Sequence, residues 1–381
     1  MKLVLAIDSF KGSLSSREVA DAFERGFRQG CPACEVVKVS IADGGEGTCQ
    51  ALVETLQGEW VEAEVCDPLM RPIRARYGLI DQGRCAVLEM AAASGLPLVR
   101  PEERDALAAN TFGTGQLIAD ALDRGARRLW IGIGGSATTD GGVGMLAALG
   151  YRFLDREGRP IDHFGGGMLA EIVSIDASHR HPALEECSLV VACDVTNPLY
   201  GPEGAACVFA PQKGADAAMV QQLDAGLRSY GRVLEAFCGY AVAETAGAGA
   251  AGGLGAGLSA VLGGRLVRGV EMVLDAMQFD RLIEGADLVV TGEGRLDRQT
   301  VMGKAPSGVL GRALKQQIPT VAIGGAVQWC PELEQSDFVA MLPIVAGPIS
   351  LEEAMHGEVA AENVRRTALQ IARMWNCKKC H

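Results

Sequence analysis

The 381-residue sequence has few histidines and no surplus of positive charge. Its five histidines all lie outside the glycine-rich loops, which disfavours a mechanism built on histidine acid–base chemistry. The formal net charge of −12 at pH 7 argues against a surface for nucleic acid or for an anionic membrane, because both polyanions attract a basic face. We therefore expect small-molecule ligands, with neither nucleic acid nor membrane as a partner.

Signature motifs of several enzyme classes are also missing. No GxxxxGK[ST] phosphate loop, GxSxG nucleophile elbow or HExxH zinc helix occurs in the chain. Gly303-Lys304 lacks both the upstream glycine and the following hydroxyl residue of a phosphate loop. These absences disfavour P-loop phosphotransferases and the hydrolases that carry the other two motifs.

Long runs of large apolar side chains are absent as well. The N-terminal apolar run, residues 3–7, stops at Asp8 and is too short for the core of a secretory signal, so we expect a cytoplasmic protein. Residues 245–264 carry no charge over a length that could cross a bilayer, but they are mostly glycine and alanine and give poor hydropathy.

Cysteine, in contrast, is plentiful. Twelve cysteines in a chain without an export signal indicate reduced thiols rather than a disulfide framework. Two CxxC pairs, Cys31–Cys34 and Cys377–Cys380 followed by His381, imitate a four-ligand zinc site. Their wide separation makes this a weak version of the motif, so zinc is only an alternative.

Both ends of the chain alternate strands with helices. Residues 3–7 predict a buried strand, and Ser15 with Glu18 forms a capping box at the start of a helix. The same alternation returns near the C-terminus, which is typical of a parallel sheet covered by helices. We predict a discontinuous, doubly wound (Rossmann or flavodoxin-like) α/β domain made of residues 1–59 and 285–381.

The segment between these ends has a different pattern. Residues 60–90 contain short alternating strands separated by turn residues, and helices with long glycine-rich loops follow. We predict that residues 60–284 form a second α/β domain with a mixed sheet, inserted into the first, with a cleft between the two. Homo-oligomerisation is left open.

The strand-terminal loops of the first domain combine glycines with charge. Ligands of open α/β sheets bind where such loops converge at the carboxyl ends of the strands. Acids beside scattered cations suit a phosphate whose oxygens are bridged to carboxylates by Mg²⁺. The charged residues of these loops are Asp8, Lys11, Asp43, Glu46, Glu293, Arg295, Asp297 and Lys304.

The middle domain has two longer glycine-rich loops, residues 132–144 and 247–257. The first contains a GxGxxA variant of the dinucleotide fingerprint, and residues 151–155 resemble a second strand that ends in an acid. A nicotinamide-dependent oxidoreductase is therefore one alternative, although little room remains for the helix that this fold needs. A non-catalytic receptor that closes on a small acid is another.

Several segments of the chain form a distinctive series in a fixed order. They include DSFKGSLS, ADGGEGT, GIGGSATTDGG, CDVTNPL, PQKGA, GAGAAGGLGAGL and VVTGEGRLDRQT. Taken together, these loops resemble the bacterial type-I glycerate kinase family, in the same order and over essentially the whole chain. The resemblance implies transfer of the γ-phosphoryl group of ATP to D-glycerate, with 2-phosphoglycerate as product, in a cleft between two α/β domains. Small departures, such as Ile7 before Asp8, leave the charged positions intact.

Within this resemblance, Asp194 is our candidate for the general base toward the glycerate hydroxyl or for a magnesium ligand, although an aspartate at this place can also cap a turn. Asp8, Asp43 and Lys11 are further catalytic candidates, and Asp43 is a second candidate magnesium ligand. The loops would bind phosphates through backbone N–H groups, and which loop binds ATP and which binds glycerate stays open. The remaining residues predicted to bind the ligands are Gly134, Gly135, Ser136, Thr138, Asp140, Lys213, Gly249, Gly252, Gly253, Glu293, Arg295 and Lys304.

Overall fold

The computed structural model describes residues 1–41 and 47–377, which divide into two compact units. Unit 1 consists of Met1–Asp43 and Val273–His381, and unit 2 of Gly44–Met272. The sequence pattern puts the boundaries at 59/60 and 284/285 instead. The difference arises partly because α2 (Thr48–Thr55) packs on strands β4 (Pro72–Ile80) and β5 (Cys85–Glu89) of unit 2.

Unit 1 contains a five-stranded sheet in the order β13-β12-β11-β1-β2. Every neighbouring pair is parallel. Renumbered within the sheet, this is the 2-1-3-4-5 order of flavodoxin-like folds, with β1 and β11 side by side at the switch point. Its strands are β1 (Lys2–Ile7), β2 (Glu35–Ser40), β11 (Leu288–Leu296), β12 (Thr320–Val327) and β13 (Ala340–Pro343).

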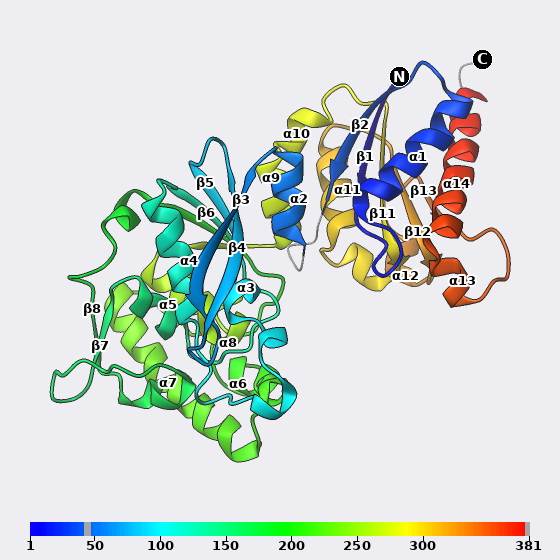
Figure 1. Cartoon of the computed structure of the whole chain (residues 1–381). Helices are drawn as coiled ribbons and strands as arrows, with labels where there is room; N and C mark the ends of the chain where they lie inside the picture. Colours follow the sequence, from blue (N-terminus) through cyan, green and yellow to red (C-terminus); the bar gives the residue numbers. More distant parts are fainter. Residues whose placement is uncertain (42–46, 378–381) are drawn as a thin grey trace. The chain divides into compact units, whose positions relative to one another are not determined.

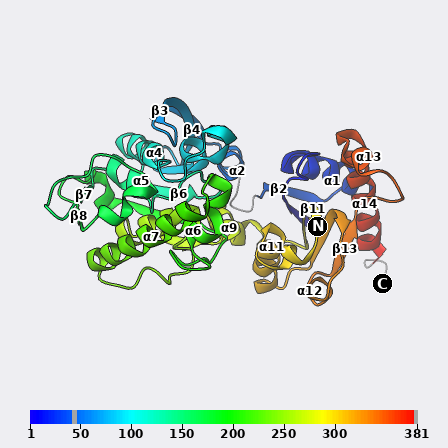
Figure 2. The same cartoon turned by 90° about the horizontal axis from the view of Figure 1, so that it is seen from below.

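Helices cover both faces of this sheet. α1 (Ser16–Gly30) and α14 (Gly357–Cys377) lie side by side on one face, and α11 (Ala305–Lys315) lies on the other (Figures 1 and 2). The predicted capping box of α1 is confirmed, because Ser15 and Glu18 exchange side-chain and backbone hydrogen bonds. A Cβ atom on Gly26 would lie 2.0 Å from the carbonyl oxygen of Arg365, so only glycine lets α1 and α14 approach this closely.

Unit 2 is built on a six-stranded mixed sheet in the order β10-β9-β6-β5-β4-β3. Its first four strands are parallel, and β4 and β3 run antiparallel to their neighbours. The predicted α/β class, with a parallel sheet and a separate mixed sheet, is confirmed. Besides β4 and β5, the strands of this sheet are β3 (Glu59–Cys66), β6 (Arg128–Gly132), β9 (Ser188–Ala192) and β10 (Arg265–Val267).

A separate two-stranded sheet bears on the nicotinamide alternative. β7 (Arg152–Leu154) pairs antiparallel with β8 (Ser174–Asp176) and does not join β6 in the main sheet. The helix after the glycine loop, α5 (Val143–Ala148), is also short. A dinucleotide fold needs a parallel second strand next to the first, so the described residues do not form that unit.

The remaining helices connect these layers. Among the described residues, none of the helices combines the length and the apolar character that a bilayer span needs. The remaining helices are α3 (Ala91–Ser94), α4 (Phe112–Asp123), α6 (Ala205–Phe209), α7 (Ala217–Cys238), α8 (Ala250–Ala256), α9 (Gly269–Ala276), α10 (Phe279–Leu282), α12 (Pro331–Glu334) and α13 (Leu351–Met355). Short 3₁₀ or π turns occur at Leu96–Leu98, Pro101–Glu103, Gly166–Glu171, Pro182–Glu186, Pro211–Lys213, Gly257–Val261 and Arg298–Val301.

Candidate active site

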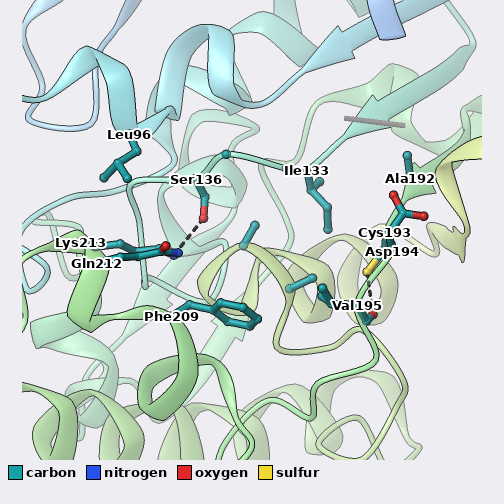
Figure 3. Close-up of a pocket in the computed structure, with 14 residues that line it drawn as sticks. Leu96, Ile133, Ser136, Ala192, Cys193, Asp194, Val195, Phe209, Gln212 and Lys213 are labelled. Carbon is teal, nitrogen blue, oxygen red and sulfur yellow. Dashed lines mark hydrogen bonds between the residues drawn. The ribbon is translucent and has the colours of Figure 1, made fainter. Parts of the chain in front are cut away.

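Unit 2 contains a cavity of about 300 Å³ at the carboxyl ends of β6 and β9 (Figure 3). The loop after β6 contributes Gly134, Gly135 and Ser136, and the loop after β9 contributes Asp194. Leu96 and Phe209 add apolar surface, and Lys213 adds a cation. The cavity therefore has the place and the mixed lining expected of a ligand site in an α/β sheet.

Lys213 is the buried cation of this cavity. Its side chain is only 2% exposed, and Nζ donates hydrogen bonds to Ser136 Oγ at 2.8 Å and to the carbonyl oxygen of Thr138 at 2.5 Å. Burial lowers the pKa of Lys213 to about 7, and the nearby Asp140 carboxylate opposes this shift. A negatively charged ligand bound next to Lys213 would therefore stabilise its charged form.

Asp140 is part of the 132–144 glycine loop and is completely buried. Its carboxylate accepts hydrogen bonds from the backbone N–H and hydroxyl of Thr111 and from the backbone N–H groups of Gly142 and Gly144. Burial raises the pKa of Asp140, and these hydrogen bonds oppose the rise. With no exposed surface, Asp140 is placed to hold the loop in shape, and the ligand contact that the sequence predicts for it stays a prediction.

Asp194 lies at the other end of the cavity from Lys213 (Figure 3). It follows β9 by two residues and is exposed. Its Oδ1 accepts a hydrogen bond from the backbone N–H of Gly269 at 2.9 Å, the first residue of α9. A carboxylate at a helix N-terminus is held in place by the helix dipole. This bond reaches a residue far away in sequence, and the turn-capping alternative stays open.

The glycine-rich loop at residues 247–257 supports the cavity mainly through packing. A Cβ atom on Gly252 would lie 2.0 Å from the carbonyl oxygen of Thr138, and Gly252 has φ +70°. Gly249 and Gly253 are buried as well, against backbone or side-chain atoms of the neighbouring loops. The residues of this loop that line the cavity are Ala250 and Ala251, and Ala251 has the left-handed φ of 52° that non-glycine residues seldom adopt.

Unit 1 has its own cavity, of about 610 Å³, at the carboxyl ends of β1 and β11. The loop after β1 contributes Asp8 and Lys11, and the end of β11 contributes Glu293 and Arg295. Lys304, which immediately precedes α11, also lines it. Charged residues predicted from distant parts of the sequence therefore meet around one cavity.

Glu293 anchors the charged side of this cavity. Its buried carboxylate accepts a hydrogen bond from the Thr300 hydroxyl at 2.7 Å and lies 3.4 Å from Lys304 Nζ. Burial raises the pKa of Glu293, while Thr300 and Lys304 oppose the rise. Arg295 forms a second ion pair, with 3.1 Å between its Nε and Asp297 Oδ2. These pairs fix the positions of two cations at the rim.

The predicted site residues thus fall into three groups. Five line the unit 2 cavity, five line the unit 1 cavity, and Thr138, Asp140 and the three glycines of the 247–257 loop form the packing beneath the first. Asp43 lies outside the described residues, as do Glu46, Cys380 and His381. Within the part of the chain that the structure describes, no cluster of three or more His, Cys, Asp or Glu side chains is arranged to hold a metal.

Sequence reasoning missed the apolar residues of both cavities. Phe209 and Leu96 in unit 2, and Ile349, Leu351 and Met355 in unit 1, carry no charge and lie outside the glycine-rich loops. The exposure of the last three is a structural signal, because large apolar side chains at a solvent-facing wall often mark a binding surface.

Comparisons with known proteins agree with one another. A family model described as the glycerate kinase family matches residues 3–376. The chain is 48% identical to a glycerate kinase of Bacillus subtilis (strain 168), over 98% of this chain and 97% of that protein. It is 45% identical to a glycerate 2-kinase of Escherichia coli (strain K12), over 98% and 97%. A crystal structure assigned as glycerate kinase 2 from Salmonella typhimurium LT2 matches with a TM-score of 0.90 and 45% identity, covering all of both chains.

Proposed function

Because the chain belongs to the glycerate kinase family, we propose that it transfers the γ-phosphoryl group of ATP directly to the 2-hydroxyl of D-glycerate, giving 2-phospho-D-glycerate. The resemblance inferred from the loops is confirmed by these relatives. The observation that carries the finer proposal is the unit 2 cavity, which has a buried ammonium at one end and an exposed carboxylate at the other. The predicted cleft between domains and the cytoplasmic location stay predictions, and homo-oligomerisation stays open.

The small cavity suits a three-carbon hydroxy acid. An ammonium has three N–H donors, and Lys213 uses two of them on Ser136 and Thr138. The third donor can bind the glycerate carboxylate, whose charge would be favourable beside a desolvated cation. With the carboxylate fixed there, the hydroxyl end of the substrate extends toward Asp194.

Asp194 is the proposed general base. The hydroxyl oxygen forms a new bond to the γ-phosphorus, the bond from that phosphorus to the bridging oxygen breaks, and ADP leaves with the electron pair. The hydroxyl proton passes to the Asp194 carboxylate. Because phosphoryl transfer depends mainly on positioning and charge stabilisation, the base contributes a moderate share of the rate acceleration.

Magnesium is proposed as the companion of ATP. Mg²⁺ is commonly held by one or two carboxylates together with the substrate phosphates and water, so a cage of protein ligands is not required. The exposed carboxylate of Asp194 has the oxygen chemistry that this ion prefers, but it would hold Mg²⁺ instead of acting as the base, so Asp43 is the ligand candidate that is compatible with Asp194 as the base. When bound, Mg²⁺ neutralises charge on the phosphate oxygens.

The direct test is an ADP-release assay with D-glycerate, ATP and Mg²⁺, followed by phosphorus NMR of the product. We expect ADP release that depends on glycerate and a product phosphorylated at carbon 2. A product phosphorylated at carbon 3 would overturn the regiochemistry while leaving the kinase activity in place. No ADP release would favour the non-catalytic receptor instead.

A further inference from the structure

We propose that the unit 1 cavity is the binding site for the adenine nucleotide, with the base on an apolar wall and the phosphates on a charged wall. This inference rests on the proposed kinase activity and deepens it by assigning one substrate to each unit. The observations that carry it are the position of the cavity in the sheet, the chemistry of its two walls and its size.

The position of the cavity is that of a nucleotide site. In sheets with the strand order of unit 1, ligands bind at the carboxyl ends of the strands beside the switch point. That point lies between β1 and β11, where the loop after β1 supplies Asp8 and Lys11 to the cavity and the C-terminal end of β11 supplies Arg295. A mononucleotide is the kind of ligand that flavodoxin-like sheets bind there.

One wall of the cavity is apolar and open to solvent. Ile349, Leu351 and Met355 are 39%, 76% and 38% exposed, although each is large and apolar. Leu351 and Met355 are four residues apart on α13, so they lie on the same side of the helix. Three such side chains lining one cavity give it apolar surface that a purine base can cover.

The other wall is charged. Lys11 and Arg295 are exposed, and Lys304 lies at the N-terminus of the eleven-residue helix α11. Three carboxylates, those of Asp8, Glu293 and Asp297, line the same cavity and balance its three cations. Together with the positive end of α11, this mixed lining favours a polyphosphate that brings Mg²⁺ with it. Glu293 and Asp297 hold Lys304 and Arg295 in place through the ion pairs described above.

Size separates the two cavities. The unit 1 cavity has about twice the volume of the unit 2 cavity, about 610 Å³ against about 300 Å³. A nucleoside triphosphate is several times larger than a three-carbon acid and needs both an apolar and a cationic surface. The unit 2 cavity has a single lining cation and fits the smaller acid.

The test measures binding separately from turnover. Calorimetric titration with MgATP in the absence of glycerate is compared for the wild type and Leu351→Ser, with steady-state KM values for both substrates. Leu351 is so exposed that its replacement leaves the core intact. We expect the Kd and KM for ATP to rise at least about fivefold through lost apolar contact with the base, while the KM for glycerate stays unchanged.

Leu314→Ser is the matched control, because Leu314 is also an exposed leucine on a helix, 42% exposed on α11, and does not line the cavity. It should leave both KM values unchanged. An increase in the KM for glycerate alone in Leu351→Ser, or no change in ATP binding, would overturn the assignment. If the wild type binds MgATP and Leu351→Ser weakens that binding, but glycerate is not phosphorylated, the nucleotide site stands and the proposed function fails.

Discussion

The Nζ atom of Lys213 lies 2.8 Å from the Oγ atom of Ser136, in a side-chain environment almost without solvent. The contact joins the short 3₁₀ turn at Pro211–Lys213 to the glycine loop that follows β6. Both partners line the cavity proposed for glycerate. The charge state of this one lysine therefore controls how well an acid binds there.

Acid binding should depend on pH near neutrality. Since burial lowers the pKa of Lys213 to about 7, the free enzyme loses this positive charge as the pH rises through 7. We expect kcat/KM for glycerate to fall above about pH 7, while kcat persists to higher pH because the bound carboxylate stabilises the protonated lysine. Lys213→Met should lower kcat/KM by at least about tenfold and abolish this pH dependence. A flat pH profile in the wild type would contradict the role of Lys213.

Asp194→Asn should lose at least about 10²-fold in kcat, because the amide is similar in size but cannot accept the hydroxyl proton. The measurement is steady-state ADP release at saturating glycerate and MgATP. Asp162→Asn, at a fully exposed side chain away from both cavities, serves as the control and should retain wild-type turnover. Near-normal kcat in Asp194→Asn would remove this carboxylate from the mechanism.

Phe209→Ala should relax substrate size selection. The Phe209 ring borders the small cavity (Figure 3), so its removal makes room for a longer hydroxy acid. We compare kcat/KM for a four-carbon dihydroxy acid with kcat/KM for glycerate. We expect the ratio of the first to the second to rise about tenfold, because one methylene group commonly changes the discrimination of an apolar pocket by at least about this factor. Phe237→Ala, on the exposed side of α7, is the control. An unchanged ratio would show that another wall limits the substrate.

Gly252→Ala should destabilise unit 2. The added Cβ atom meets the carbonyl oxygen of Thr138 at 2.0 Å, and the residue has φ +70°. Gly263→Ala has a similar φ of +68° but meets nothing within 4 Å, so it isolates the cost of the backbone conformation. We expect Gly252→Ala to cost about 1–3 kcal/mol more than Gly263→Ala, measured as a lower melting temperature in calorimetry. If both substitutions lowered the melting temperature equally, the loops that carry Gly252 and Thr138 would have to separate at no cost in stability, which would contradict the prediction.

Much of the fold could be predicted because local signals agree with it. Ser15 and Glu18 set the start of α1, and the apolar run that became β1 is buried on both faces as a central parallel strand must be. The domain boundaries were harder to place, because α2 follows a strand of unit 1 in sequence but packs on the sheet of unit 2. Sequence order shows which elements follow one another, and only packing shows which of them share a core.

The site was predicted where charge and glycine converge. Lys213 and Asp194 stood out in the sequence because each is a charged residue beside a glycine or turn signal, and both line the unit 2 cavity, while their roles stay predictions. The burial that lowers the pKa of Lys213 is a tertiary property. Asp140 looked like a ligand contact for the same reason, yet its four hydrogen bonds turn it inward. The apolar wall that includes Leu351 was missed because a leucine on a short helix has the same sequence pattern whether it faces a core or a cavity.

The central place of β1 in the unit 1 sheet has a consequence for biosynthesis. One edge of β1 pairs with β2 close by in sequence, but the other pairs with β11, which begins at Leu288. Unit 2 is continuous between Gly44 and Met272 and can assemble while the ribosome is still translating. The nascent N-terminal strand must then wait with one edge of backbone N–H and C=O groups unpaired until β11 has been translated, late in synthesis, which makes this interval the vulnerable stage of the protein's maturation.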